Sequence, residues 1–136
     1  MIVFADTYAL IAWLNPRDNA HAAVREFLAS YGGRLVTTEW VLMEVADALS
    51  APHARKLAIE FLQSIRSDPN YEVIGYDADT YGEGFECFAS HHDKGWSLTD
   101  CISFGVMRKR QLNQALTGDR HFTQAGFHAV FEAGKK

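Results

Sequence analysis

Short apolar segments alternate along this chain with longer segments of helical periodicity, and this alternation limits the fold more than any other feature. The first apolar segment, residues 2–5 (IVFA), is uncharged and rich in β-branched and aromatic side chains. Such a run is typical of a strand that is buried on both faces of a parallel sheet. The longer segments carry apolar side chains three and four residues apart, as amphipathic helices do. The alternation predicts an α/β sandwich with a mostly parallel central sheet flanked by helices.

The predicted elements fill most of the chain. Strands are expected at residues 2–5, 35–37, 71–76, 115–117 and 129–131. Helices are expected at residues 8–14, 20–31, 38–49, 54–65, 77–91 and 97–109. Two glycines weaken the prediction for 77–91, because glycine is a poor helix former. No linker, repeat or low-complexity segment interrupts the series, so we expect a single domain over residues 1–136.

The balance of charged residues limits how this protein could bind nucleic acid. The chain of 136 residues has 17 Asp and Glu against 13 Lys and Arg, and its formal net charge is -4. This surplus argues against a protein that holds nucleic acid mainly through spread positive charge, because each phosphate contact normally recruits a Lys or Arg. Nucleic acid remains open as a substrate, since bound divalent cations can reverse the sign of a site.

Cysteine usage and the apolar segments bear on where the protein works. Cys87 and Cys101 lie in separate apolar segments, and we expect two buried thiols rather than a disulfide. The sequence after Met1 lacks the pattern of a signal peptide. The longest apolar stretches fall far short of the roughly 20 residues that a membrane span needs. We therefore expect a cytoplasmic protein that does not contact membranes.

Four acidic residues follow predicted strands or lie in predicted helices close to them. Asp6 directly follows the first strand, Asp119 comes two residues after the fourth, and Asp100 lies in the first turn of the last helix. Glu44 belongs to a helical segment that is apolar on nearly every side. Its carboxylate is expected to be enclosed and to need a partner or a cation. Because ligands of parallel sheets bind at the carboxyl ends of the strands, these acids are candidates for one site.

Each acid also has a purely structural interpretation. Asp6 can cap the helix that follows it, Asp100 can complete a capping box with Ser97, and Asp119 can form a turn. Glu44 can pair with an arginine. Together, however, four carboxylates at one sheet edge repel one another unless protons or metal ions neutralise them. Mg²⁺ and Mn²⁺ prefer oxygen ligands and promote phosphodiester hydrolysis in such sites.

Four blocks around these acids resemble the acidic blocks of the PIN domain, in the same order and at the family's spacing. They are 4–12 (FADTYALIA), 38–46 (TEWVLMEVA), 97–104 (SLTDCISF) and 115–122 (ALTGDRHF). The chain is similar over almost its whole length to the stand-alone VapC-like toxins of bacterial and archaeal toxin-antitoxin pairs. The resemblance implies a PIN-like three-layer sandwich with a central sheet of four to five strands.

The resemblance also implies a metal-dependent endoribonuclease that leaves 5′-phosphate and 3′-hydroxyl ends. The residues that would hold Mg²⁺ or Mn²⁺, and so be catalytic, are Asp6, Glu44, Asp100 and Asp119. Thr7 and Thr99 are candidates to orient a carboxylate or a metal-bound water, or they bond only to backbone at a helix start. Arg120 is the candidate contact to substrate phosphate. The partners implied are RNA as substrate, a small antitoxin protein and a second copy of the chain in a homodimer.

Two other functions stay open on the sequence alone. A receiver-like phosphoacceptor domain shares the size, the α/β pattern and an Mg²⁺ site, but it should carry paired acids after its first strand, where this chain has only Asp6. A non-catalytic binding module with the same fold is the second alternative, and the intact acids argue against it. The six histidines show no pair at metal-ligand spacing, so we expect them at the surface or at the edge of the core.

Overall fold

Five parallel strands form one central sheet in the order β3-β2-β1-β4-β5. The computed structural model describes residues 1–132, and residues 133–136 of the expected domain lie outside the described part. The strands are β1 (Ile2–Ala5), β2 (Arg34–Thr38), β3 (Tyr71–Ile74), β4 (Gln114–Leu116) and β5 (His128–Ala129). The helices are α1 (Thr7–Leu14), α2 (His21–Ser30), α3 (Glu39–Ala48), α4 (Pro52–Ile65), α5 (Ala78–Ser90), α6 (Leu98–Lys109) and α7 (Arg120–Gln124).

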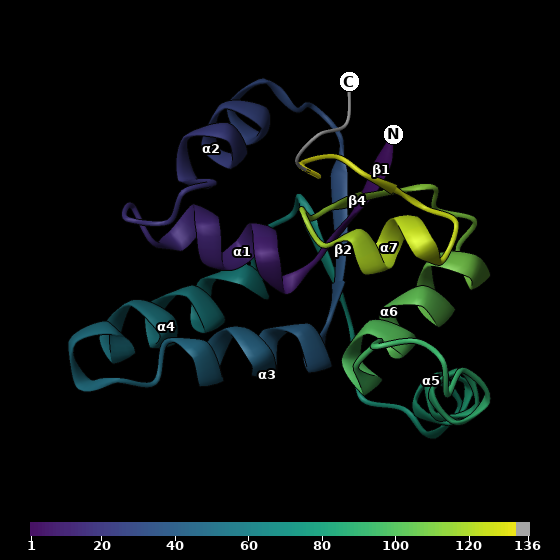
Figure 1. Ribbon diagram of the computed structural model, residues 1–136. Helices are drawn as coiled ribbons and strands as arrows, with labels where there is room; N and C mark the ends of the chain where they lie inside the picture. The colour runs from purple at the N-terminus through teal and green to yellow at the C-terminus, as the bar shows by residue number, and fades with distance from the viewer. Residues whose placement is uncertain (133–136) are drawn as a thin grey trace.

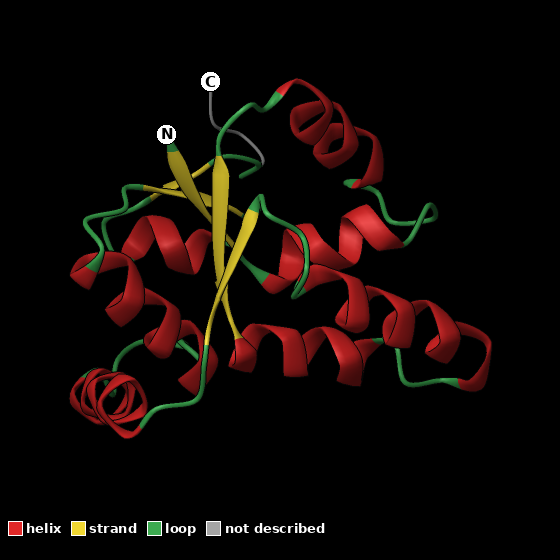
Figure 2. Cartoon of the chain, turned by 180° about the vertical axis from the view of Figure 1, so that it is seen from behind, coloured by secondary structure: helices red, strands yellow, loops and turns green. Residues whose placement is uncertain are grey.

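Helices cover both faces of the sheet. In Figures 1 and 2, α1 to α4 gather on one side of the strands, and α5, α6 and α7 lie on the other. The three-layer α/β sandwich predicted from the sequence is thereby confirmed, and every strand in it is parallel to its neighbours. Within residues 1–132, no helix is both long enough and apolar enough to cross a membrane.

The first strand lies at the centre of the sheet because its side chains are apolar on both faces. Val3, Phe4 and Ala5 are fully buried, and β1 pairs with β2 on one side and with β4 on the other. The chain builds β2 and β3 outward from β1 and then crosses over to place β4 on the opposite side. The strand order therefore reverses between β1 and β4, which is where open parallel sheets form a ligand crevice at the carboxyl ends of their strands.

The predicted helices and strands are all present, with ends that differ by up to a few residues. Helix α7 was not predicted, because five residues are too few to show a helical period and the segment starts with a Thr-Gly-Asp turn sequence. Helix α5 forms in spite of its glycines. A Cβ on Gly84 would lie 2.3 Å from Cγ1 of Ile102, so glycine there allows α5 to pack closely against α6. Both cysteines are free thiols, as expected, but only Cys101 is buried, and Cys87 is half-buried.

Candidate active site

A pocket of about 530 Å³ lies at the switch point between β1 and β4. All four acids predicted from the sequence line it: Asp6, Glu44, Asp100 and Asp119. Thr7, Tyr8, Ser97, His121 and two glycines complete the wall. The starts of α1, α3 and α6 lie at this end of the sheet in Figure 1, so loops and first helical turns supply most of the side chains, and Glu44 comes from the second turn of α3. The fold therefore brings the four carboxylates together, as the positions of the acids after strands suggested.

Asp6 is the most deeply buried of the four acids, with 5% of its surface exposed. It occupies the N-cap position of α1, but its carboxylate makes no capping hydrogen bond, so the interpretation of Asp6 as a simple cap is wrong. Instead, Oδ2 accepts a hydrogen bond of 2.9 Å from the hydroxyl of Thr117. Burial raises the pKa of Asp6 to about 7 against the lowering effect of that bond, and the charges of Asp100 and Glu44 add to the rise.

Glu44 reaches the pocket from the middle of α3. The hydroxyl of Thr7 donates a hydrogen bond of 2.6 Å to its Oε1. The alternative that Glu44 pairs with an arginine is not supported, since no such ion pair forms within residues 1–132. Nor is α3 enclosed on every side as expected, because Met43 next to Glu44 is half exposed. The helix leaves one side open, and Glu44 faces the pocket on a border between core and solvent.

Asp100 and Asp119 each combine a structural contact with a place in the pocket. Asp100 completes the predicted capping box with Ser97 at the start of α6. Asp119 caps α7, where its Oδ1 accepts a hydrogen bond of 2.9 Å from the backbone N–H of His121. The side chains of Asp100 and Asp119 are 13% and 34% exposed. Capping holds both carboxylates in place and leaves part of each accessible to a ligand.

His121 lies between these two carboxylates. Its Nδ1 is 3.0 Å from Oδ2 of Asp100 and 3.4 Å from Oδ1 of Asp119. One ligand atom from each of the three residues lies within 4.8 Å of the other two, a spacing at which a single metal ion can be held. The sequence analysis found no histidine pair at metal-ligand spacing and did not single out His121, whose partners in this group are two carboxylates. The sequence feature that could have identified His121 is its position two residues after Asp119.

The donor set of the pocket fits a divalent cation. Lys and Arg are absent from the residues that line it in the described chain. Of the four acids, Asp100 and Asp119 have a basic side chain within 4 Å among residues 1–132, and that side chain is the imidazole of His121. Carboxylate oxygens that partly face solvent are the ligands that hard divalent ions prefer. Mutual repulsion of these carboxylates is relieved when a cation binds between them.

Two predicted residues lie outside the wall of the pocket, and Thr117, like His121, was missed. Thr99 and Arg120 are not among the lining residues, and Arg120 is exposed at the start of α7. Thr117 was missed, although it bonds both Asp6 and, through its oxygen, the backbone N–H of Asp119. Its only sequence signal was its place at the end of a strand. Thr7 has the position expected of it, against a carboxylate.

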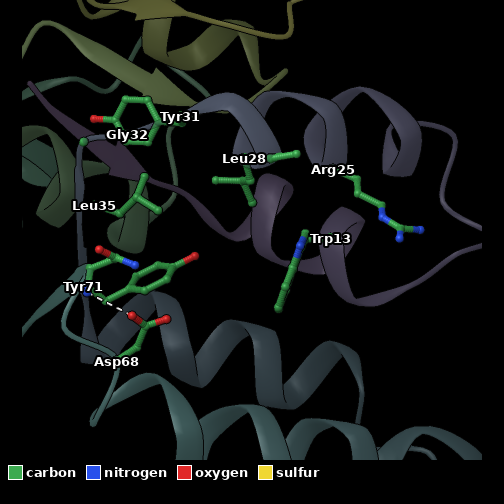
Figure 3. Close-up of a pocket in the computed structure, with 11 residues that line it drawn as sticks. Trp13, Arg25, Leu28, Tyr31, Gly32, Leu35, Asp68 and Tyr71 are labelled. Atoms are coloured by element: carbon green, nitrogen blue, oxygen red, sulfur yellow. Dashed lines mark hydrogen bonds between the residues drawn. The ribbon is translucent and has the colours of Figure 1, made fainter.

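A second cavity, of about 570 Å³, lies at the amino ends of β2 and β3. Figure 3 shows Trp13 and Arg25 on one side of it and Leu35, Asp68 and Tyr71 on the other. None of the four predicted acids lines this cavity. It holds a single carboxylate and aromatic side chains, so the convergence of acids that metal-assisted hydrolysis needs is found in the pocket at the opposite sheet edge.

Comparisons with known proteins agree with this fold. The chain is 29% identical over 129 residues to the 23S rRNA-specific endonuclease VapC20 of Mycobacterium tuberculosis. This alignment covers 95% of this chain and 98% of that protein. The crystal structure of the same VapC20, a sarcin-ricin loop cleaving toxin, matches with a TM-score of 0.87 and 28% identity over 96% of this chain and 98% of the other.

Two further structures share the fold at lower identity. FitAcB from Neisseria gonorrhoeae matches with a TM-score of 0.66 and 18% identity, over 97% of each chain. VapBC2 from Rickettsia felis, in a structure bound to a DNA fragment from the VapBC2 promoter, matches with a TM-score of 0.66 and 16% identity over 95% of this chain and 97% of the other.

The family model of the PIN domain matches residues 3–128. The resemblance drawn from the four acidic blocks is thus confirmed, and the chain belongs to the PIN domain family of nucleases.

Proposed function

We propose that this protein is a Mg²⁺- or Mn²⁺-dependent endoribonuclease and the toxin of a toxin-antitoxin pair. The observation that carries the proposal is the convergence of Asp6, Glu44, Asp100 and Asp119 on one open pocket that no Lys or Arg of the described chain neutralises. PIN-domain nucleases use divalent metals. The similarity to VapC20 over 95% of the chain supports RNA as the substrate. The protein would then act in the cytoplasm, where cellular RNA is translated.

The four carboxylates would hold the metal, and their neighbours would hold the carboxylates. When bound, the divalent ion supplies an activated water and compensates the charge of the phosphodiester. Thr117 and Thr7 fix the orientation of Asp6 and Glu44 through hydrogen bonds of 2.9 Å and 2.6 Å. Asp100 and Asp119 are fixed by their capping contacts. Arg120 is the proposed contact to substrate phosphate, because it is exposed and directly follows Asp119. Thr99 is retained as a candidate to orient a bound water.

The test of this proposal is cleavage of RNA by the purified protein. Large-subunit ribosomal RNA is the first substrate to try, with an unrelated RNA beside it, in Mg²⁺ or Mn²⁺ and with excess chelator. We expect cleavage that the chelator abolishes and that Asp6→Asn or Asp100→Asn lowers by more than the 10- to 100-fold typical of residues that only orient ligands. Asp79→Asn, at an exposed position on α5, is the matched control. Cleavage that is unaffected by chelator and by both site variants would sink the proposal.

A protein partner would be needed to keep such an enzyme inactive. We propose a small antitoxin that covers the acidic pocket and places a basic side chain among its carboxylates, since a crowded carboxylate site attracts Arg. Expression of the protein alone is expected to arrest growth, and co-expression with the product of an adjacent small gene is expected to relieve the arrest. Growth that is normal without any partner would count against this part of the proposal.

We also propose that the protein forms a homodimer. Tyr81, Phe85 and Phe88 of α5 are each more than 40% exposed and offer apolar surface for such contact. Sedimentation equilibrium on the purified protein should give twice the monomer mass. Phe85→Lys is expected to shift it to the monomer while leaving its circular dichroism spectrum unchanged. A monomer in the unmodified protein would overturn the proposal.

A further inference from the structure

We infer that His121 is a nitrogen ligand of the divalent cation at this site, which makes the site favour transition-metal ions such as Mn²⁺ over Mg²⁺. This inference rests on the proposed function, because it concerns the same pocket. It adds His121 to the four acidic residues that the sequence predicts as metal ligands. The evidence is the position of the His121 ring between Asp100 and Asp119.

The distances around the His121 ring match the geometry of one octahedral ion. Ligands at about 2.1 Å from an octahedral cation lie about 3 Å from their neighbours in the same shell. The Nδ1 atom of His121 is 3.0 Å from Oδ2 of Asp100 and 3.4 Å from Oδ1 of Asp119. Nδ1 can therefore lie next to a carboxylate oxygen of Asp100 and to one of Asp119 in the shell of one ion, and the ligand atoms of the three residues lie within 4.8 Å of one another. The backbone N–H of His121 also donates a hydrogen bond to Oδ1 of Asp119, which fixes that carboxylate beside the ring.

The nitrogen of His121 that faces the carboxylates is Nδ1, 3.0 Å from Oδ2 of Asp100. A neutral imidazole that carries its proton on Nε2 presents the lone pair of Nδ1. The atom that lies against Asp100 is then the one that would ligate a cation held by the same carboxylates.

A nitrogen ligand changes which ions the pocket prefers. Mg²⁺ takes oxygen ligands and keeps several waters, whereas imidazole binds transition-metal ions well. A shell of carboxylates alone would discriminate less against Mg²⁺ than a shell with one imidazole. The Asp100, Asp119 and His121 group is therefore expected to bind Mn²⁺ and Co²⁺ more tightly than an all-oxygen site of the same charge.

Metal binding to the purified protein, measured without RNA, tests this inference. Mn²⁺ and Mg²⁺ affinities are measured by calorimetry, and the Mn²⁺-loaded protein is examined by electron spin echo spectroscopy for coupling to an imidazole nitrogen. His121→Asn places an amide near the position of Nδ1 and so substitutes oxygen for nitrogen. We expect the nitrogen coupling to disappear in this variant and the ratio of Mn²⁺ to Mg²⁺ affinity to fall by about tenfold or more. His92→Asn, at an exposed histidine, should change neither.

The outcomes separate this inference from the proposed function. The role of His121 would be overturned if the unmodified protein bound Mn²⁺ without nitrogen coupling and if His121→Asn left the ratio of Mn²⁺ to Mg²⁺ affinity unchanged. Loss of Mn²⁺ binding in Asp100→Asn would show in that case that the metal site itself stands. Failure of the unmodified protein to bind Mn²⁺ or Mg²⁺ at all would overturn the proposed metal site, and the inference with it. Circular dichroism of His121→Asn checks that the variant is folded. If it is not, the nitrogen coupling in the unmodified protein decides the question alone.

Discussion

Thr117 and Asp6 are joined by a hydrogen bond of 2.9 Å although 111 positions separate them in the chain. Both are buried, and they follow two neighbouring strands, β4 and β1. The oxygen of the same hydroxyl accepts a hydrogen bond of 3.1 Å from the backbone N–H of Asp119. The side chain of Thr117 thus contacts two of the four acids of the pocket, Asp6 and Asp119.

Replacing Thr117 by valine should therefore weaken both the fold and the site. Valine has nearly the same shape but leaves the Asp6 carboxylate without its donor, and the loss of a buried hydrogen bond costs about 1–3 kcal/mol. We expect the free energy of unfolding to fall by that amount and RNA cleavage to fall by about 10- to 100-fold. Urea denaturation and a cleavage assay measure the two effects. Thr117→Ser keeps the hydroxyl and should retain most of both, so equal losses in the two variants would contradict this role.

The stability of the metal-free protein should depend on the ionisation of Asp6. Burial raises the pKa of Asp6 from 3.8 to about 7, so the folded state binds this proton more tightly than the unfolded state does. The stabilisation is fully present below about pH 4 and is lost as the pH rises through 7. A shift of this size sets an upper limit of roughly 4 kcal/mol on the effect.

Asp6→Asn removes this proton equilibrium and provides the comparison. In excess chelator, we expect the variant to be more stable than the unmodified protein at pH 8, with the difference shrinking toward pH 5. Thermal or urea unfolding at each pH measures it. Asp79→Asn, at an exposed position, corrects for general effects of removing a charge. A constant difference between Asp6→Asn and the unmodified protein from pH 5 to pH 8 would show that Asp6 does not titrate in this range.

Thr7 should affect activity more than stability. Its hydroxyl donates to Glu44 at a partly exposed position, so solvent can replace the bond in the folded protein. Thr7→Val is expected to lower cleavage by about 10- to 100-fold, because the carboxylate loses its fixed orientation, and to change the unfolding free energy by less than about 1 kcal/mol. Thr7→Ser should recover activity. Thr80→Val removes a hydroxyl that bonds Asp77 at the start of α5 and is the control, expected to cleave normally.

The two glycines of α5 should respond to alanine in opposite directions. A Cβ on Gly84 would lie 2.8 Å from the Cα of Ile102, so Gly84→Ala forces α5 away from α6 and should cost about 1–3 kcal/mol. At Gly82 no heavy atom lies within 4 Å of such a Cβ. Because alanine is the better helix former, Gly82→Ala should stabilise the protein by up to about 1 kcal/mol. Urea denaturation of both variants is the measurement, and a stabilising Gly84→Ala would contradict the packing described here.

The sequence by itself determined the fold class and the location of the four acids. A short apolar run rich in β-branched and aromatic side chains, such as residues 2–5, favours a buried strand, and helical periods between such runs favour helices on the faces of the sheet. An acid that follows a buried strand directly, as Asp6 does, must then lie at the carboxyl edge. The capping box at Ser97 is equally local, since both partners lie within one helical turn.

Only the tertiary structure decided which side chains serve those acids. Thr117 reaches Asp6, and His121 reaches Asp100, because the crossover from β3 to β4 places β4 beside β1. Sequence periodicity carries no information about such a pairing, since it depends on strand order and not on neighbours along the chain. For the same reason, the glycine at position 84 looked unfavourable for a helix until the contact with Ile102 showed what a side chain there would displace.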